Sequence, residues 1–168
     1  IGTHISIKDR NTDNSYQYGL SVDAYQLFTN YNSSEGAVAY NLTNEMDLSD
    51  NFKAYFNSNG FFSKYQFRDK ARSNNRNLFR IQPGILYSNG KIDIKGGFNF
   101  VYENDTLQNM NRLHVYPDLS RKYRLLPNVS AMAGLRGDVK AVRLRDLLIE
   151  NPYLTDSVTL SHTLMPFE

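Results

Sequence analysis

Histidine, serine and acidic side chains are the groups in this chain that could do chemistry. The three histidines, His4, His114 and His162, lie far apart in the sequence, and none belongs to a metal-binding spacing such as H-x-x-E-H. No G-x-S-x-G motif marks a nucleophilic serine, and the lack of cysteine removes thiolate chemistry and disulfides. The sequence therefore predicts no catalytic residue, no metal site and no cofactor, and we do not expect an enzyme.

Oxygen-rich stretches offer one further kind of site. The residues from Asp9 to Asp13 and the pair Asn104-Asp105 carry oxygen ligands of the type that Ca²⁺ prefers. Both stretches lie outside the apolar alternation described below, where solvated polar loops are expected. The loop interpretation is favoured over a calcium site.

An alternation of apolar and polar residues with a period of two dominates the chain and is typical of β-strands. Between Lys91 and Glu103 the even positions are apolar or aromatic apart from Gly96, whereas the odd positions are mostly charged or small. The same pattern predicts seven strands, at residues 16–24, 35–48, 52–62, 77–87, 91–103, 113–124 and 129–136. Short pieces at 3–8 and 157–164 are candidates for two more.

The connections between these strands are of two kinds. Asn89-Gly90 suits a type I′ hairpin turn. Tight turns occur at residues 49–51, 88–90 and 126–128, and longer polar loops at 68–76, 104–111 and 137–156. We expect a meander with the tight turns on one rim, toward the periplasm, and the long loops on the other.

Two folds fit strands with one apolar face. In a soluble sandwich or lipocalin-like barrel that face points inward, whereas in a transmembrane barrel it contacts lipid and the polar face lines the lumen. Most predicted strands reach the 9–11 residues that cross a bilayer, the rims differ as in outer-membrane barrels, and aromatic residues lie toward strand ends. We therefore predict an all-β fold, an antiparallel up-and-down transmembrane β-barrel to which residues 1–168 contribute about eight strands. Because the chain ends at Phe167-Glu168 without a terminal aromatic on a strand, we expect part of a larger barrel.

The alternation assigns each strand residue to a face. The residues expected to contact lipid are Tyr18, Leu20, Val22, Val38, Tyr40, Phe56, Ile81, Ile85, Ile94, Phe98, Phe100 and Ala131. The candidates for facing the lumen are Asp23, Lys53, Arg80, Asp93, Lys95, Lys122, Arg124 and Arg136. Their mixed signs argue against strong charge selectivity, and we expect Lys95→Gln to be mild. The net charge of +2 is too balanced for an electrostatic nucleic-acid binder.

Residues 116–154 resemble the second half of the barrel of TonB-dependent receptors. The motifs that carry the resemblance are Tyr116-Pro117-Asp118-Leu119-Ser120, Tyr123-Arg124-Leu125, Pro127-Asn128-Val129, Gly134-Leu135-Arg136-Gly137, Leu144-Arg145-Asp146-Leu147 and Asn151-Pro152-Tyr153-Leu154. Met132-Ala133 replaces the usual aromatic-small pair, and residues 139–143 lack a proline that receptors often carry. Neither a plug domain nor a TonB box is present in the 168 residues, so the resemblance implies the barrel and not energy-coupled import.

Three functions remain open at this point. The first is a TonB-dependent-transporter-like barrel in the bacterial outer membrane that takes up a nutrient or chelate. The second is an accessory or structural barrel subunit of an outer-membrane assembly or secretion complex. The third is a complete eight-stranded barrel that serves as an anchor or adhesin. The expected partners are outer-membrane lipid and other outer-membrane or periplasmic subunits, and the solute is not specified by the sequence.

Overall fold

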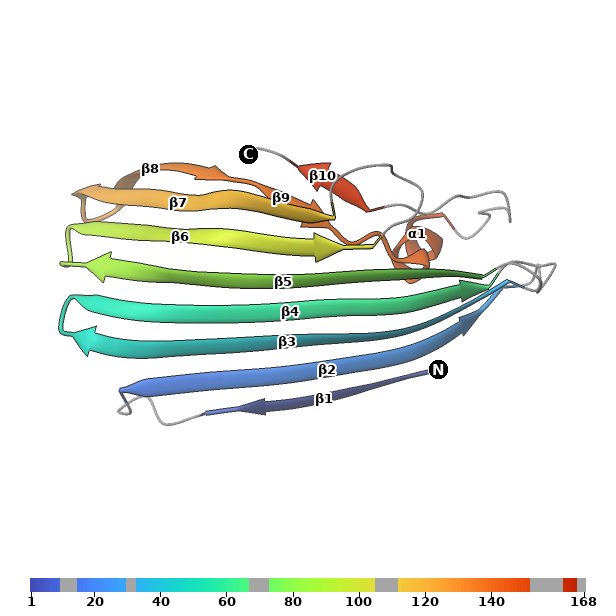
Figure 1. The fold of residues 1–168 in the computed structure, drawn as a ribbon. Helices are drawn as coiled ribbons and strands as arrows, with labels where there is room; N and C mark the ends of the chain where they lie inside the picture. The colour runs from blue at the N-terminus through green and yellow to red at the C-terminus, as the bar shows by residue number, and fades with distance from the viewer. Residues whose placement is uncertain (10–14, 30–32, 67–72, 105–111, 152–161, 166–168) are drawn as a thin grey trace.

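A single antiparallel sheet of eight strands forms the body of the molecule in a computed structural model (Figure 1). The structure describes residues 1–9, 15–29, 33–66, 73–104, 112–151 and 162–165. The strands follow one another in chain order, which confirms the predicted all-β, up-and-down antiparallel fold. Their bounds are β1 Gly2–Lys8, β2 Tyr16–Phe28, β3 Ser34–Ser49, β4 Phe52–Gln66, β5 Ser73–Ser88, β6 Ile92–Glu103, β7 Leu113–Leu126 and β8 Val129–Arg136.

The sheet is open. Strands β1 and β8 are its two edges and do not pair with each other. A complete eight-stranded barrel is therefore not formed within the described residues.

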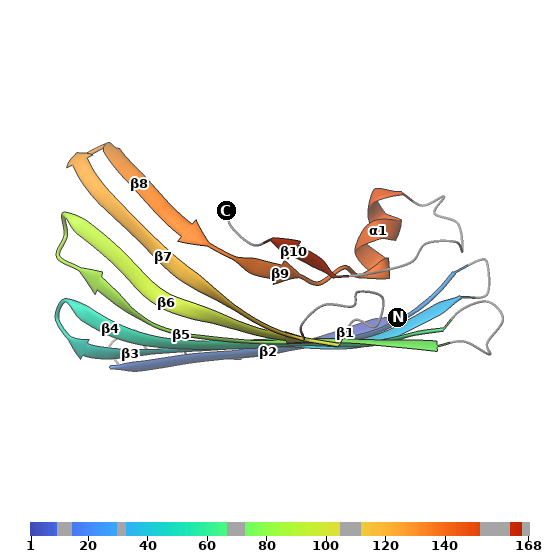
Figure 2. The ribbon, with the colours of Figure 1, turned by 45° about the horizontal axis from the view of Figure 1, so that its top comes forward.

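The pairing register keeps the alternation in phase across all eight strands. Val22 pairs with Tyr40, Tyr40 with Gly60, Gly60 with Phe79, and Phe79 with Tyr102. Because side chains on directly paired residues lie on the same face, one face of the sheet is apolar from edge to edge. We call this the outer face and the opposite one the concave face, since the sheet curls around it (Figure 2).

The tight turns lie together at one end of the sheet, as predicted, and the opposite strand ends lie at the other (Figure 1). At the turn between β5 and β6, Gly90 has a φ of 78°, a left-handed conformation that glycine adopts without steric cost. The side-chain oxygen of Asn89 accepts hydrogen bonds from the backbone N–H groups of Lys91 and Ile92. The turn is thus stabilised by a side chain as well as by the backbone.

A tyrosine packs across two glycines on the concave face. Gly84 of β5 pairs with Gly97 of β6, and the ring of Tyr55 from β4 lies across both. An added Cβ at Gly97 would come within 2.4 Å of the Tyr55 hydroxyl and 2.6 Å of the Pro83 carbonyl oxygen. Glycine is therefore required there by the close approach of a ring and a neighbouring strand.

The segment after β8 departs from the prediction. Residues 137–156 were expected to form a loop at the rim in which only Leu144–Glu150 is compatible with a turn or two of helix; they include α1 over that same range (Leu144–Glu150) and the unexpected strand β9 (Asp138–Lys140). Strand β9 pairs with β10 (Thr163–Met165), and all three elements lie on the concave side of the sheet (Figure 2). We call residues 137–151, which contain β9 and α1, together with β10 the inner segment. Residues 152–156 of the predicted loop lie outside the described residues.

An apolar patch on the concave face explains why the inner segment folds back. Phe61, Leu78 and Val101 are buried on this face beside Ala37 and Ala39, and Val139 of β9 packs against this cluster with 0% exposure. Burying a valine side chain contributes on the order of 1.5–3 kcal/mol. In the described ranges, no helix is both long enough and apolar enough to cross a lipid bilayer.

Candidate functional site

The concave face carries the residues with functional potential. The register places all eight lumen-facing candidates on this one face: Asp23, Lys53, Arg80, Asp93, Lys95, Lys122, Arg124 and Arg136. None of the twelve residues expected to contact lipid is buried in the structure, and Phe98 keeps 55% of its surface exposed. The two sets therefore lie on opposite faces of the sheet.

The charged side chains of the concave face are largely paired with one another. Lys53 lies 3.2 Å from Glu45 and 3.1 Å from Asp47, and Arg124 lies 3.0 Å from Asp93. At the C-terminal end of β8, Arg136 lies 3.6 Å from Asp138. This pairing leaves little net field on the face, as the mixed signs of the sequence indicated.

Lys95 pairs with a buried carboxylate, that of Asp118, which the sequence did not indicate. Its ammonium lies 2.6 Å from a carboxylate oxygen of Asp118, a residue that is only 3% exposed. A lysine that neutralises a buried carboxylate is costly to remove, because the carboxylate then stays buried without a counter-charge. We therefore expect Lys95→Gln to cost more than the sequence alone indicates.

A buried ion pair joins the inner segment to the sheet. A guanidinium nitrogen of Arg76 in β5 lies 2.6 Å from a carboxylate oxygen of Glu35 in β3, and both side chains are at most 1% exposed. The other Glu35 oxygen accepts hydrogen bonds from the Tyr25 hydroxyl at 2.9 Å and from the backbone N–H of Leu144 at 3.2 Å. Arg76 also donates to the carbonyl oxygen of Val142 at 2.7 Å. The pair thus links β2, β3 and β5 to the start of α1.

Two further side chains of the sheet bind the backbone of the inner segment. Arg80 donates to the carbonyl oxygen of Val139 at 2.7 Å and lies 2.5 Å from the carboxylate of Asp138. Asn99, which is 0% exposed, donates to the carbonyl oxygen of Gly137 at 2.9 Å. Asn99 also donates to the Asp138 carboxylate at 3.1 Å, so the two side chains fix the path of the segment through its main chain and through Asp138.

Arg76, Arg80 and Asn99 hold the inner segment on the sheet, and the sequence did not single out Arg76 or Asn99. Arg76 was assigned to the loop at 68–76, whereas β5 already begins at Ser73 and extends the alternation of Arg80 back through Leu78 to Arg76. Asn99 was grouped with ordinary polar positions of β6. The available signal was a pair of adjacent apolar residues in each of three strands, at Phe61-Phe62, Leu78-Phe79 and Phe100-Val101. Such pairs place apolar groups on both faces and indicate that something packs on the concave one.

The histidines have separate surroundings. His4 lies 2.7 Å from Asp23 at the exposed edge of the sheet, and His114 lies 3.7 Å from Glu103. His162 is 2% exposed, and its ring lies in a T-shaped arrangement with that of Phe61, with the ring centroids 6.4 Å apart. No cluster of three or more His, Cys, Asp or Glu side chains able to hold a metal ion occurs among the described residues. The calcium candidates at residues 10–13 and at Asp105 lie outside them.

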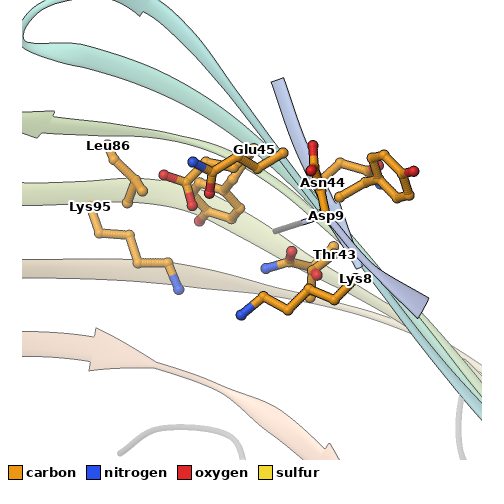
Figure 3. Close-up of a pocket in the computed structure, with 11 residues that line it drawn as sticks. Lys8, Asp9, Thr43, Asn44, Glu45, Leu86 and Lys95 are labelled. Carbon is orange, nitrogen blue, oxygen red and sulfur yellow. The ribbon is translucent and has the colours of Figure 1, made fainter. Parts of the chain in front are cut away.

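A cavity of about 440 Å³ opens on the concave face (Figure 3), and neither Glu35 nor Arg76 of the buried ion pair lines it. Side chains from β1 through β6 line it, with Lys8 and Lys95 extending toward it from opposite sides. Its polar lining includes Gln17, Thr43 and Asn57. A volume of this size falls within the range of small-molecule sites.

The sheet and its two faces define the class of protein: an all-β protein built on a curled antiparallel meander with one apolar and one polar face. Comparison with known proteins adds no match, since no family model, no curated protein and no solved structure is significantly similar to the chain. The resemblance to TonB-dependent receptors therefore stays a prediction.

Proposed function

We propose that this chain forms part of the wall of a larger transmembrane β-barrel in the bacterial outer membrane, of the TonB-dependent-receptor type, that serves uptake of a nutrient or chelate. The observation that carries the proposal is the outer face. Large apolar side chains cover it from Ile5 on β1 to Leu135 on β8, and they are exposed. Monomeric soluble proteins rarely expose contiguous apolar patches above a few hundred Å².

The lengths of the strands fit a membrane wall. The central strands β2 to β7 have between 12 and 16 residues. At about 3.3 Å per residue they extend roughly 40–53 Å. A tilted strand needs only 9–11 residues to cross the hydrocarbon, so these strands are long enough to cross it and extend beyond it.

The edges of the sheet support completion by further strands. All residues of β1 and β8 are exposed, and their alternation continues that of the sheet, with Ile5 and Ile7 outward at one edge and Val129 and Leu135 outward at the other. An unpaired edge strand offers free N–H and C=O groups that pair readily with another strand. In the proposed barrel, other strands occupy both edges.

The inner segment favours a second candidate function. It occupies part of the concave face that would line the lumen, and the sheet binds it through buried Arg76 and Asn99. A wall whose lumen side is filled by its own chain suits an accessory or structural subunit of an outer-membrane complex. Stoichiometric copurification of other outer-membrane proteins would favour this function over transport.

Single tryptophans test the lipid-facing assignment, because the chain has no tryptophan of its own. Phe98→Trp places the probe at mid-strand on the outer face, and Asn41→Trp places it at mid-strand on the concave face. In vesicles of lipids brominated along the acyl chains, we expect strong quenching of the first variant and weak quenching of the second. Equal quenching of both, or none of either, refutes the membrane wall.

A further inference from the structure

We propose that the cavity between Lys8 and Lys95 binds a neutral, hydroxyl-rich solute such as a short saccharide. The cavity measures about 440 Å³ and lies on the concave face of the sheet (Figure 3). The inference rests on the proposed function for the role of such a solute as cargo. The site itself is argued from the side chains around the cavity.

Uncharged hydrogen-bonding side chains form about half of the polar lining, beside two lysines and two carboxylates. Gln17, Thr43 and Asn57 line the cavity from three strands, and the Thr43 hydroxyl, which donates to the carbonyl oxygen of Gly19 at 3.4 Å, can still accept a hydrogen bond. Within the described part of the chain, the Gln17 and Asn57 amides have no other hydrogen-bond partner. Each amide both donates and accepts hydrogen bonds, which suits hydroxyl groups, because these also do both.

The charges around the cavity cancel. Lys8 and Lys95 are balanced by Asp9 and Glu45 among the lining residues. Lys95 is already neutralised by Asp118 at 2.6 Å, and Glu45 by Lys53 at 3.2 Å. With as many cations as carboxylates in the lining, an anionic solute gains no net electrostatic attraction, and this arrangement favours a neutral ligand over an acidic one.

The floor of the cavity is preformed. Tyr55 is 7% exposed, and its ring packs closely on the backbone at Gly84 and Gly97. The Lys95 ammonium lies 5.1 Å from the centre of the same ring, within the range of a cation–π contact. A rigid floor reduces the ordering cost of binding.

Isothermal titration of the detergent-solubilised chain with cellotriose, xylotriose and mannotriose tests the site, and trigalacturonate serves as an acidic probe of equal length. We expect at least one neutral trisaccharide to bind and trigalacturonate to bind more weakly. Asn57→Ala and Thr43→Val should each weaken binding about 2- to 10-fold, the loss of a single neutral hydrogen bond. Asn41→Ala, on the same face but outside this cavity, should leave binding unchanged.

The proposal is overturned if no neutral trisaccharide binds, if trigalacturonate binds more tightly, or if Asn57→Ala and Thr43→Val both bind as the unaltered chain does. Circular dichroism of each variant establishes that the sheet is intact before titration. The brominated-lipid measurement on Phe98→Trp is made on the same preparation. Quenching without saccharide binding refutes only the site, whereas binding without quenching refutes only the membrane wall.

Discussion

Glu35→Gln is the substitution from which the structure predicts the clearest loss of stability. The change removes the negative charge from a group of almost the same shape. It leaves the Arg76 guanidinium, which is 1% exposed, buried without a counter-charge. The Glu35 carboxylate accepts hydrogen bonds from three donors, on Arg76, Tyr25 and Leu144. A glutamine side chain has only one oxygen to accept them.

Removing one partner of a buried ion pair typically costs about 3–5 kcal/mol. We expect the lower part of this range, because the remaining oxygen still accepts a hydrogen bond. A matched control is Glu45→Gln, whose carboxylate pairs with Lys53 at 39% and 42% side-chain exposure. Exposed pairs contribute about 0.2–1 kcal/mol, so the two substitutions should differ several-fold in cost.

Urea unfolding of the chain in detergent micelles, followed by tyrosine fluorescence, measures the free energy of unfolding of both variants. Limited trypsin digestion adds a local measurement at Arg143 and Arg145, which lie in the segment that the ion pair anchors. Glu35→Gln should accelerate cleavage there, and Glu45→Gln should not. In the double variant Glu35→Gln/Arg76→Met, part of the stability should return because no charge remains buried.

Equal destabilisation by Glu35→Gln and Glu45→Gln would refute this reasoning. So would unchanged trypsin cleavage at Arg143 and Arg145, since the ion pair would then not anchor the inner segment.

Three further substitutions test other parts of the structure by the same unfolding measurement. Gly97→Ala should cost about 1–3 kcal/mol by overpacking, whereas Gly96→Ala, whose added Cβ meets nothing closer than 4.0 Å, should be neutral or slightly stabilising; a reversed order contradicts the close packing at Gly97. Lys95→Gln should lower the free energy of unfolding by about 1–3 kcal/mol or more because it leaves the buried Asp118 carboxylate unpaired. A loss below about 0.5 kcal/mol would show that another group compensates the Asp118 charge. In vesicles, Phe98→Arg should cost about 2–4 kcal/mol if it lies near the bilayer midplane, while Phe98→Leu should be nearly silent; a large loss for Phe98→Leu would indicate a close-packed protein neighbour.

The strands and their faces were predictable because the signal is local. Alternation depends on neighbouring residues along a single strand, so Phe98 and Lys95 could be assigned to opposite faces without knowing any strand's partner. The turn at Asn89-Gly90 was predictable for a similar reason, since two residues suffice to favour it. The order of the strands followed from the short connections, which favour antiparallel neighbours.

The length of β5 was harder to predict. Residues 73–76 read Ser-Asn-Asn-Arg, a composition that favours turns, yet they extend the strand as far as Ser73. Pairing with β4 through Gln66 gives these residues backbone hydrogen-bond partners on one side, and this tertiary gain outweighs the weak local preference. Arg76 reaches its buried position only as a result of that pairing.

The position of the inner segment was decided by tertiary structure alone. Residues 138–150 have a composition compatible with a rim loop, and their fold depends on a patch assembled from Phe61, Leu78 and Val101 on three different strands. That patch exists only after β4, β5 and β6 have paired in register. The sequence by itself determined a sheet with an apolar and a polar face, because a period of two is encoded residue by residue. Only tertiary structure decides which part of the chain covers the polar face. The burial of Val139 and the ion pair between Glu35 and Arg76 are contacts between residues distant in sequence, and they form only once the sheet is assembled.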